Sequence, residues 1–470
     1  TTGGSNVVVG VDALGADTQG SRAVAIGMNA LLRQNFTTAT NGYNVAVGFS
    51  AGDHITTGTE NILVGAFAGD ALTDTDFNVA VGSEALSSDT LGGRSTAIGT
   101  AALNAQNFTT ATETYNVAVG FHAGNDVTTG TFNTITGGLA ADALTVGGRN
   151  TVYGKSALTS DTKGSRAVAI GLSALASQNF TTATDNYNVA VGYSAGGVIT
   201  TGIHNTIVGG LAGDALTDAS SNVAVGYLAL STDTLGSRST AIGRRALGEQ
   251  NFTTATNTNN TAVGYNAGLN VTTGDQNTFL GSQAGDAVTS GSRNVAVGVA
   301  TLGSETQGSR SVAVGNFALS AQNQTTATNA YSVAVGHEAG KSITTGVHNT
   351  ITGGLAGDAI TTGNNNVANG YGALSAAEAN NANVAIGANS LLVMTNTVAS
   401  TFNTAVGFQS GASVSSGINN TIVGANAGSN TNSGNSNCFL GKDAGDTTTS
   451  GSKNICLGQN ANNASGTGDN

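Results

Sequence analysis

The sequence predicts an all-β fold in which the chain winds into a β-solenoid, a flattened β-roll of stacked coils. Three observations lead to this prediction. A short phrase that ends in glycine recurs along the whole chain, glycine is abundant at 69 of 470 residues, and proline and tryptophan are absent. Charged residues make up only 9% of the chain, against about 25% in ordinary globular domains. A chain without proline suits a structure in which most backbone N–H groups donate to a ladder.

The recurring phrase is Asn-Val-Ala-Val-Gly with variants, and its closing glycine marks each coil. These glycines run from Gly10 to Gly458 and define 26 coils, most of them 17 residues long and every fourth about 21, so that the pattern repeats after 72 residues. Repeats of this length each form one unit that buries its apolar face by stacking on its neighbours. We therefore expect one continuous solenoid over residues 1–458, followed at 459–470 by a polar tail or the start of a further coil.

Each coil is predicted to contain two strands and two turns. In one coil, residues 44–47 form the first strand, Gly48 closes it, Ala51 and Gly52 turn the chain, and residues 55–57 form a second, Thr-rich strand. Glycine adopts positive φ at little cost, which suits both turns. At about 4.8 Å per rung, the coils would make a rod on the order of 125 Å long.

The position four residues before each closing glycine predicts a ladder of asparagine side chains. It is Asn in 20 of the 26 coils. Stacked Asn residues form hydrogen-bonded amide ladders, so we interpret this column as structural. The ladder residues that we single out are Asn44, Asn61, Asn78, Asn116, Asn133 and Asn150.

The strand phrase is apolar on both faces, which indicates self-association. Side chains of a strand alternate between faces, so the two valines of each phrase face one way and the alanine faces the other. We expect the valines to fill the coil and the alanines to face a second copy of the chain. The candidate contact residues are Ala46, Ala80 and Ala118.

The long coils share the phrase Gln-Asn-Phe-Thr-Thr-Ala-Thr. Its aromatic residue recurs every 72 residues and is either a brace over the coil edge, which we favour, or a subunit contact; these residues are Phe36, Phe108, Phe180 and Phe252. The same phrase contains an Asn-x-Thr sequon. The candidate glycosylation sites are Asn35, Asn107, Asn179, Asn251 and Asn323.

Charge and cysteine content limit the partners of the chain. The net charge of −12 argues against nucleic acid and anionic membranes, which need clustered Lys and Arg. No apolar run is long enough to span a membrane. An acid precedes an arginine by five residues in each superrepeat, as Asp89 precedes Arg94, and we expect these residues to pair on the surface. Cys438 and Cys456 occupy adjacent positions of the motif, so they should point to opposite faces as two free thiols.

The sequence does not predict an enzyme, a cofactor or a metal site. The segment from Gly48 to Gly52 matches Gly-x-Ser-x-Gly, but no helix is expected to follow it, as a nucleophile elbow requires. The repeat itself accounts for both glycines. The five histidines show no spacing typical of metal ligands.

The residues of three phrases, 23–27, 311–315 and 383–387, resemble the YadA-like head repeats of trimeric autotransporter adhesins. Similar repeats occur in phage tail fibres. The resemblance implies a homotrimer of left-handed β-rolls that sits at the tip of a surface fibre and binds host or matrix. The coils here are longer than the usual head repeat, and no heptad stalk is recognisable.

From this resemblance we expect a structural shaft or head segment of an extracellular homo-oligomeric fibre, with adhesion or tethering as its role. Its partners would be further copies of itself, as a homotrimer, and an unknown host, matrix or cell-surface receptor. The location would be extracellular, on a cell surface or a virion appendage. The alternatives are a receptor-binding phage tail-fibre segment, an ice-binding solenoid with Thr arrays, and a polysaccharide-cleaving solenoid.

Overall fold

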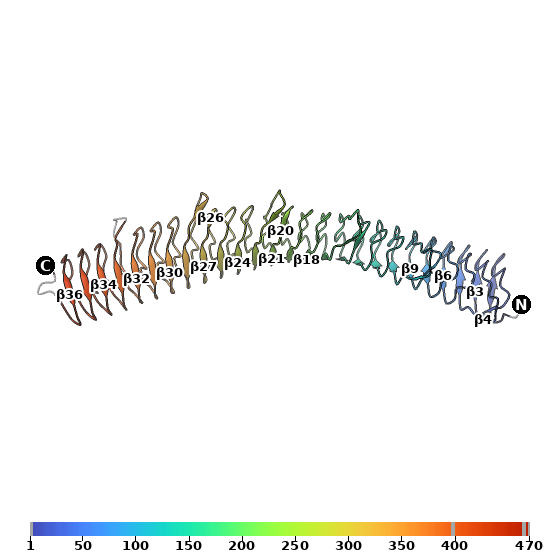
Figure 1. The fold of residues 1–470 in the computed structure, drawn as a ribbon, viewed down its shortest axis with the longest axis horizontal. Helices are drawn as coiled ribbons and strands as arrows, with labels where there is room; N and C mark the ends of the chain where they lie inside the picture. The colour runs from blue at the N-terminus through green and yellow to red at the C-terminus, as the bar shows by residue number, and fades with distance from the viewer. Residues whose placement is uncertain (1–2, 396–399, 463–466, 469–470) are drawn as a thin grey trace. The chain divides into compact units, whose positions relative to one another are not determined.

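The computed structural model describes residues 3–395, 400–462 and 467–468, which form a parallel β-solenoid of about 26 coils. None of these residues is helical, so none of them forms a helix that could cross a membrane. The chain divides into two units. Unit 1 comprises residues 1–237 and 253–255, and unit 2 comprises residues 238–252 and 256–470. Each unit is a stack of coils (Figure 1).

In unit 1, each coil contributes one three-residue strand to a parallel ladder. For example, Val45 pairs with Ile62, and Ile62 pairs with Val79. The strands are β1 (Val7–Val9), β3 (Val24–Ile26), β5 (Val45–Val47), β6 (Ile62–Val64), β7 (Val79–Val81), β9 (Thr96–Ile98), β11 (Val117–Val119), β12 (Thr134–Thr136), β13 (Thr151–Tyr153), β15 (Val168–Ile170), β17 (Val189–Val191), β18 (Thr206–Val208) and β19 (Val223–Val225).

Unit 2 repeats this arrangement with the same parallel register from rung to rung. Its strands are β21 (Thr240–Ile242), β23 (Thr261–Val263), β24 (Thr278–Leu280), β25 (Val295–Val297), β27 (Val312–Val314), β29 (Val333–Val335), β30 (Thr350–Thr352), β31 (Val367–Asn369), β32 (Val384–Ile386), β33 (Thr404–Val406), β34 (Thr421–Val423), β35 (Cys438–Leu440) and β36 (Ile455–Leu457).

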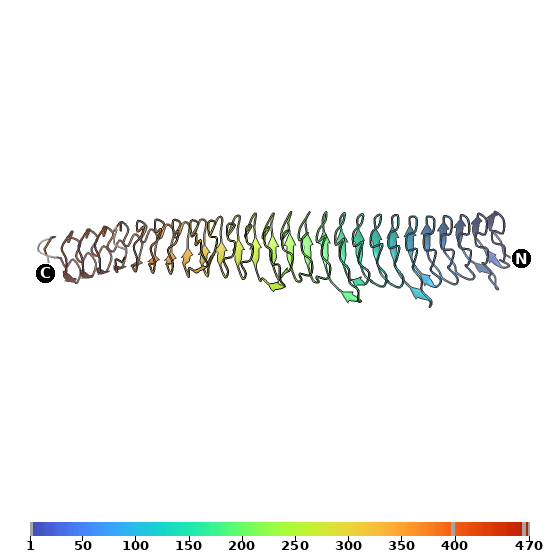
Figure 2. The ribbon, with the colours of Figure 1, turned by 90° about the horizontal axis from the view of Figure 1, so that it is seen from above.

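The long coils add two-residue strands outside these ladders. They are β2 (Gly20–Ser21) and β4 (Thr40–Asn41), β8 (Gly92–Gly93) and β10 (Thr112–Glu113), β14 (Gly164–Ser165) and β16 (Thr184–Asp185), β20 (Gly236–Ser237) and β22 (Thr256–Asn257), and β26 (Gly308–Ser309) and β28 (Thr328–Asn329). Within each unit they pair in parallel, as β8 does with β10. Figure 2 shows several of them in loops that project from the edge of the stack.

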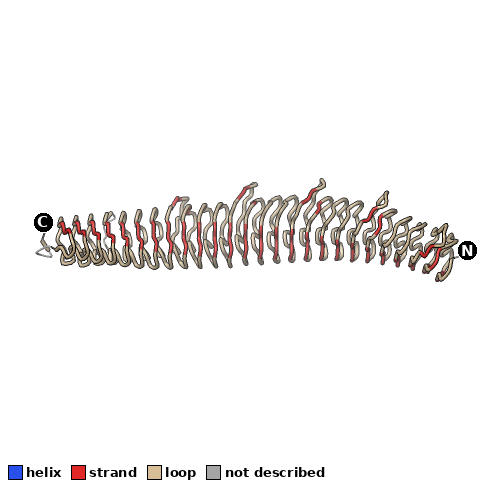
Figure 3. The backbone as a smooth tube through the Cα atoms, turned by 60° about the horizontal axis from the view of Figure 1, so that its bottom comes forward, coloured by secondary structure: helices blue, strands red, loops and turns tan. Residues whose placement is uncertain are grey.

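The predicted second strand at residues 55–57 is wrong. After β5, the chain makes a run of turns over residues 49–54, and residues 55–57 belong to no strand. The physical reason is the backbone conformation, because Ser50 and Gly52 both have positive φ, 51° and 59°. Left-handed residues at alternate positions bend the chain. The turn extends into the predicted strand, because the Ile55 N–H donates to the Gly52 carbonyl of its own coil at 3.1 Å. Each typical coil is therefore one short strand followed by a long turn, as Figure 3 shows.

The predicted orientation of the strand faces is also wrong. Ala46, Ala80 and Ala118 are completely buried within their own chain, so they fill the coil interior and cannot face a second copy. Val45 and Val47 point outward and are partly exposed. The reason is the width of the coil, because the turn opposite the strand supplies the large apolar side chains and leaves room only for a small one at most strand centres.

Turn and strand centre compensate for each other in volume. Where the strand centre is Leu63, the facing turn positions are Gly52 and Gly69, and a Cβ atom at Gly52 would lie 2.6 Å from Leu63 Cδ1. Where the strand centre is Ala80, the corresponding turn position is Leu86, which is fully buried. Because interiors are close-packed, this alternation keeps the core filled from coil to coil.

The aromatic residues of the long coils lie inside their own chain. Phe36, Phe108, Phe180 and Phe252 are only 4%, 7%, 5% and 8% exposed. A Cβ atom on Gly20 would come within 2.8 Å of the Phe36 ring, and one on Gly42 within 3.0 Å. The ring thus lies against glycines at the base of the projecting loop. These residues brace the loop, and their prediction as subunit contacts is wrong.

Neither cysteine forms a disulfide, and the two side chains face opposite ways. Cys438 begins β35 and is partly exposed, whereas Cys456 is at the centre of β36 and is 4% exposed. Burial raises the pKa of the Cys456 thiol. A buried thiol with a raised pKa is a poor nucleophile at neutral pH.

Candidate binding site at the second long loop

The projecting loop over residues 104–114 forms one wall of a shallow hollow in unit 1. Here β8 pairs with β10, so that Thr112 lies beside Gly92 and Glu113 beside Gly93. The opposite wall is the turn that contains Phe77. The volume of the hollow is about 350 Å³, at the lower end of the roughly 300–1,000 Å³ of small-molecule sites.

A buried carboxylate fixes the base of this loop. Asp89 is completely buried, and its Oδ1 accepts hydrogen bonds from the backbone N–H groups of Gly92 at 3.0 Å and Phe108 at 3.1 Å. Its Oδ2 accepts a hydrogen bond from Gln106 Nε2. The other end of the same amide, Gln106 Oε1, accepts a hydrogen bond from Asn116 Nδ2 at 2.9 Å. These contacts link the loop to the ladder of asparagines. The Gln106 side chain explains why glutamine recurs in the long-coil phrase, whereas Phe108 contributes only its backbone N–H to Asp89.

The predicted surface pairing of Asp89 with Arg94 is therefore wrong. Asp89 turns inward to cap the start of β8, whereas Arg94, with φ of 61°, projects from the rim. Arg94 pairs instead with Glu113 of the loop, Nε to Oε1 at 3.1 Å. In the next superrepeat, Arg166 pairs in the same way with Asp185 at 3.0 Å.

Asp89 makes the stability of the loop depend on pH. Burial raises the pKa of Asp89 above its ordinary value of 3.8, although the hydrogen bonds from Gln106, Phe108 and Gly92 oppose the shift. A raised folded-state pKa means that the folded loop binds the proton more tightly than the unfolded chain does. The stability due to this group is thus fully present below pH 3.8 and is lost as pH rises through the raised pKa.

We expect amide protection of the loop, corrected for intrinsic exchange, to decrease as pH rises from about 3.5 through the raised pKa. Asp89→Asn, which cannot ionise, should flatten that profile. The measurement is hydrogen exchange of the loop at a series of pH values, with Asp126→Asn at an exposed site as the matched control. An Asp89→Asn profile as steep as that of the unmodified chain would contradict this account.

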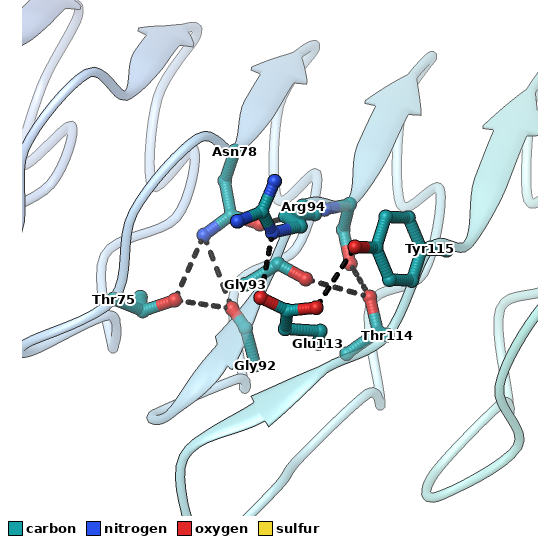
Figure 4. A network of polar contacts seen from close by, with 9 residues as sticks. Thr75, Asn78, Gly92, Gly93, Arg94, Glu113, Thr114 and Tyr115 are labelled. Atoms are coloured by element: carbon teal, nitrogen blue, oxygen red, sulfur yellow. Dashed lines mark hydrogen bonds and ion pairs between the residues drawn. The ribbon is translucent and has the colours of Figure 1, made fainter.

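A polar and aromatic network lines the rim of the hollow (Figure 4). The Arg94 guanidinium lies 5.0 Å from the Phe77 ring centre and 5.7 Å from that of Tyr115. The Tyr115 hydroxyl donates to Glu113 Oε2 at 2.8 Å, and this hydrogen bond raises the pKa of Tyr115. The Arg94 and Glu113 side chains are 41% and 60% exposed, so their ion pair contributes only about 0–1 kcal/mol.

The asparagine side chains that the sequence singles out stack as a hydrogen-bonded ladder. In each, Oδ1 accepts the backbone N–H of the next rung, as Asn44 does from Asn61 at 2.9 Å and Asn61 from Asn78 at 3.0 Å. Their Nδ2 groups donate to backbone carbonyls, as Asn44 does to Gly58 at 2.7 Å. The same contacts recur along unit 1 at Asn116, Asn133 and Asn150.

The sequon asparagines all lie at the start of the long loops, next to the buried aromatic position. Asn35, Asn107 and Asn179 are exposed, whereas Asn251 and Asn323 are partly buried. The threonines two residues later, such as Thr37 and Thr109, are exposed. Glycosylation of these sites stays a prediction.

The Gly-x-Ser-x-Gly segment lies in the turn after β5. Ser50 is only 5% exposed and has φ of 51°, which places it in a repeated turn rather than at the start of a helix. Among the described residues, no group of three or more His, Cys, Asp or Glu side chains is arranged to hold a metal ion.

Comparison with known proteins gives no family. No protein-family model matches the chain, and no curated protein is significantly similar to it.

Sequence reasoning missed one row of exposed side chains. The residue before each ladder position has positive φ in every coil, and many of these positions carry bulky residues. In unit 1 they include Arg22, Tyr43, Phe77, Arg94, Tyr115, Phe132, Arg149, Arg166, Tyr187 and His204. Bulky residues seldom adopt positive φ, so their side chains, and not their backbone preference, must account for this choice. The signal was present in the sequence as Arg and aromatic residues five before the closing glycine.

Proposed function

We propose that this chain is a structural shaft or head segment of an extracellular homo-oligomeric fibre, with adhesion or tethering as its role. The observation that carries the proposal is the outer face of the strand ladder. In unit 1, the last residue of the strand is Val, Ile or Tyr in every coil except at Thr136. In unit 2 the last residue is Val, Ile or Leu in every coil except at Thr352 and Asn369.

This outer column is long and partly exposed. Val9, Ile26, Ile98 and Tyr153 are 59%, 36%, 39% and 61% exposed. Thirteen rungs at about 4.8 Å make an apolar stripe on the order of 60 Å long in unit 1. Contiguous apolar patches of more than about 300–600 Å² are rare on monomeric proteins and usually mark an interaction site.

Identical copies suit this stripe, because the same outward residues recur at every rung and can meet their equivalents at matching spacing. We propose a homotrimer, as the resemblance to adhesin head repeats implies. The proposal includes the finer regularity of 17-residue coils with a coil of about 21 residues at every fourth step. Hydrogen bonds that span 17 residues along the asparagine ladder support it.

Ice binding is less well supported by the threonine side chains. The Thr57 hydroxyl donates to Asp74 Oδ1 at 2.9 Å, and the Thr73 hydroxyl donates to the Thr90 carbonyl at 3.0 Å. These hydroxyls form bonds within the chain, whereas an ice-binding face needs them arrayed toward water.

The double variant Ile62→Glu, Ile98→Glu tests the assembly face. Both side chains are exposed in the single chain, so the coils should fold while the charges prevent close packing of copies. We expect its sedimentation mass to fall to that of one chain, 45.9 kDa. Thr110→Glu, at an exposed loop position, should leave the assembly unchanged. Full assembly by the double variant would overturn the choice of face.

A further inference from the structure

The hollow at the second long loop differs from the equivalent places in the other superrepeats. Five of its positions are Thr75, Phe77, Leu91, Gly93 and Glu113. One superrepeat later, 72 residues on, the same positions are Gly147, Arg149, Lys163, Ser165 and Asp185. If the superrepeats served only assembly, there would be no reason for so many residues around this one hollow to differ from those of the next superrepeat.

The glycine at position 93 removes a hydrogen bond that the other superrepeats have. In each of those, a serine hydroxyl accepts a backbone N–H from the coil before, at 3.0 Å. These pairs are Gly4 with Ser21, Gly148 with Ser165, Ser220 with Ser237 and Ser292 with Ser309. Gly93 has no hydroxyl to offer. Among the described residues, the equivalent N–H of Asp76 donates to no acceptor.

The walls of the hollow combine an aromatic face with hydrogen-bonding groups of both kinds. Phe77 is 45% exposed and lines one side, while Leu91 and Ala111 add apolar surface. The Asp76 N–H and the Arg94 guanidinium are donors, and the Glu113 carboxylate is an acceptor. Small-molecule sites bind ligands through apolar contact and a few directed polar groups.

Asp74 adds a further carboxylate at the rim. Hydrogen bonds from the Thr56 and Thr57 hydroxyls lower the pKa of Asp74 below its ordinary value. Together with Asp76 and Glu113, it makes the hollow acidic, in a chain of net charge −12. An anionic ligand would be repelled here.

We propose that this hollow binds a neutral oligosaccharide. A sugar ring has an apolar C–H face that packs on an aromatic ring such as Phe77. Its edge carries hydroxyls that both donate and accept, which matches the free Asp76 N–H and the Glu113 carboxylate. This inference rests on the adhesive role proposed above and names the chemistry of the receptor.

The test is calorimetric titration of the full chain with neutral trisaccharides of glucose, galactose, mannose and N-acetylglucosamine, and with trigalacturonic acid and Ca²⁺. We expect at least one neutral trisaccharide to bind. Phe77→Ala should weaken that binding at least tenfold. Tyr187→Ala, which removes an exposed aromatic residue from another superrepeat, should leave it unchanged.

The double variant Thr75→Gly, Gly93→Ser is the sharper probe. It installs the residue pair found at Gly147 and Ser165, so it should fold, and its new hydroxyl should accept the Asp76 N–H. We expect its affinity for the trisaccharide to be at least tenfold lower than that of the unmodified chain. Undiminished binding by this variant, binding of only the acidic trisaccharide or Ca²⁺, or no binding of any neutral trisaccharide would overturn the proposal. Sedimentation mass measured on the same samples reports separately on the assembly.

Discussion

Gly137→Ala is expected to disrupt the stack around coils β11 to β13, because a closing glycine has no room for a side chain. Gly137 has φ of +135°, and a Cβ atom there would lie 2.5 Å from the backbone oxygen of Gly154 and 2.6 Å from its carbonyl carbon. Both are backbone atoms of the next rung, which cannot move without breaking the ladder. Backbone strain of this kind costs about 1–3 kcal/mol, and the steric clash adds to it.

The measurement is hydrogen exchange of backbone amides, since local opening in a repeat protein need not unfold the whole chain. We expect protection to fall in β11, β12 and β13. The adjacent variant Gly138→Ala is the matched control, because a Cβ atom there would meet only the Phe121 oxygen at 3.9 Å. Alanine already occupies that place in other coils, as at Ala66. Equal protection in both variants would contradict the close approach of the closing glycines.

Asn133→Ala is expected to be the second severe change. The Asn133 Oδ1 accepts the Asn150 N–H at 3.0 Å, and its Nδ2 donates to the Gly147 carbonyl at 3.0 Å. Both partners would be left buried without a hydrogen bond. Each such loss costs about 1–3 kcal/mol, so we expect a destabilisation on the order of 2–6 kcal/mol.

Limited proteolysis and hydrogen exchange of the neighbouring rungs measure this loss. Asn125→Ala is the matched control, because its Nδ2 donates only to the adjacent Asp126 in a partly exposed turn. Asn133→Asp keeps the acceptor for Asn150 and loses the donor to Gly147. The protection of its neighbouring rungs should therefore lie between that of Asn125→Ala and that of Asn133→Ala, because the retained bond to Asn150 offsets the cost of burying the charge. An Asn133→Ala variant as well protected as the control would show that the ladder is not a major source of stability.

The coil repeat could be predicted from sequence because its strongest signals are local. A closing glycine and an asparagine four residues earlier recur together, and each has a single physical role, close backbone approach or amide stacking. Stacking in register then follows from the constant spacing. The ladder of Asn44, Asn61 and Asn78 needed no knowledge of distant residues.

The direction of the strand faces could not be predicted from the strand alone. Val45 and Ala46 are both apolar, so alternation does not tell which one is inside. The deciding residues lie in the turn, where Leu86 fills the space opposite Ala80 and Gly52 makes room for Leu63. The prediction of a second strand at residues 55–57 was wrong for a related reason, because nothing in the residue type of Ser50 indicates the left-handed backbone of the turn before it.

The candidate site was only partly visible in the sequence. The departure at Gly93 can be seen by comparing superrepeats, but its consequence, a free N–H at Asp76, depends on the stacking of β8 on the coil before. Asp89 is separated from Gln106 by 17 residues and was assigned to the wrong partner. The five-residue spacing in the sequence favoured Arg94 as the partner of Asp89, whereas in the structure Asp89 is buried and bonds to the loop.

Sedimentation equilibrium of the unmodified chain tests the central claim, that this solenoid is a self-associating fibre segment, most directly. The account predicts a mass of three times 45.9 kDa at micromolar concentration. This mass should not decrease when the protein is diluted to the lowest detectable concentration. A mass of 45.9 kDa at all concentrations would contradict it, since the outer apolar column would then face water along its whole length.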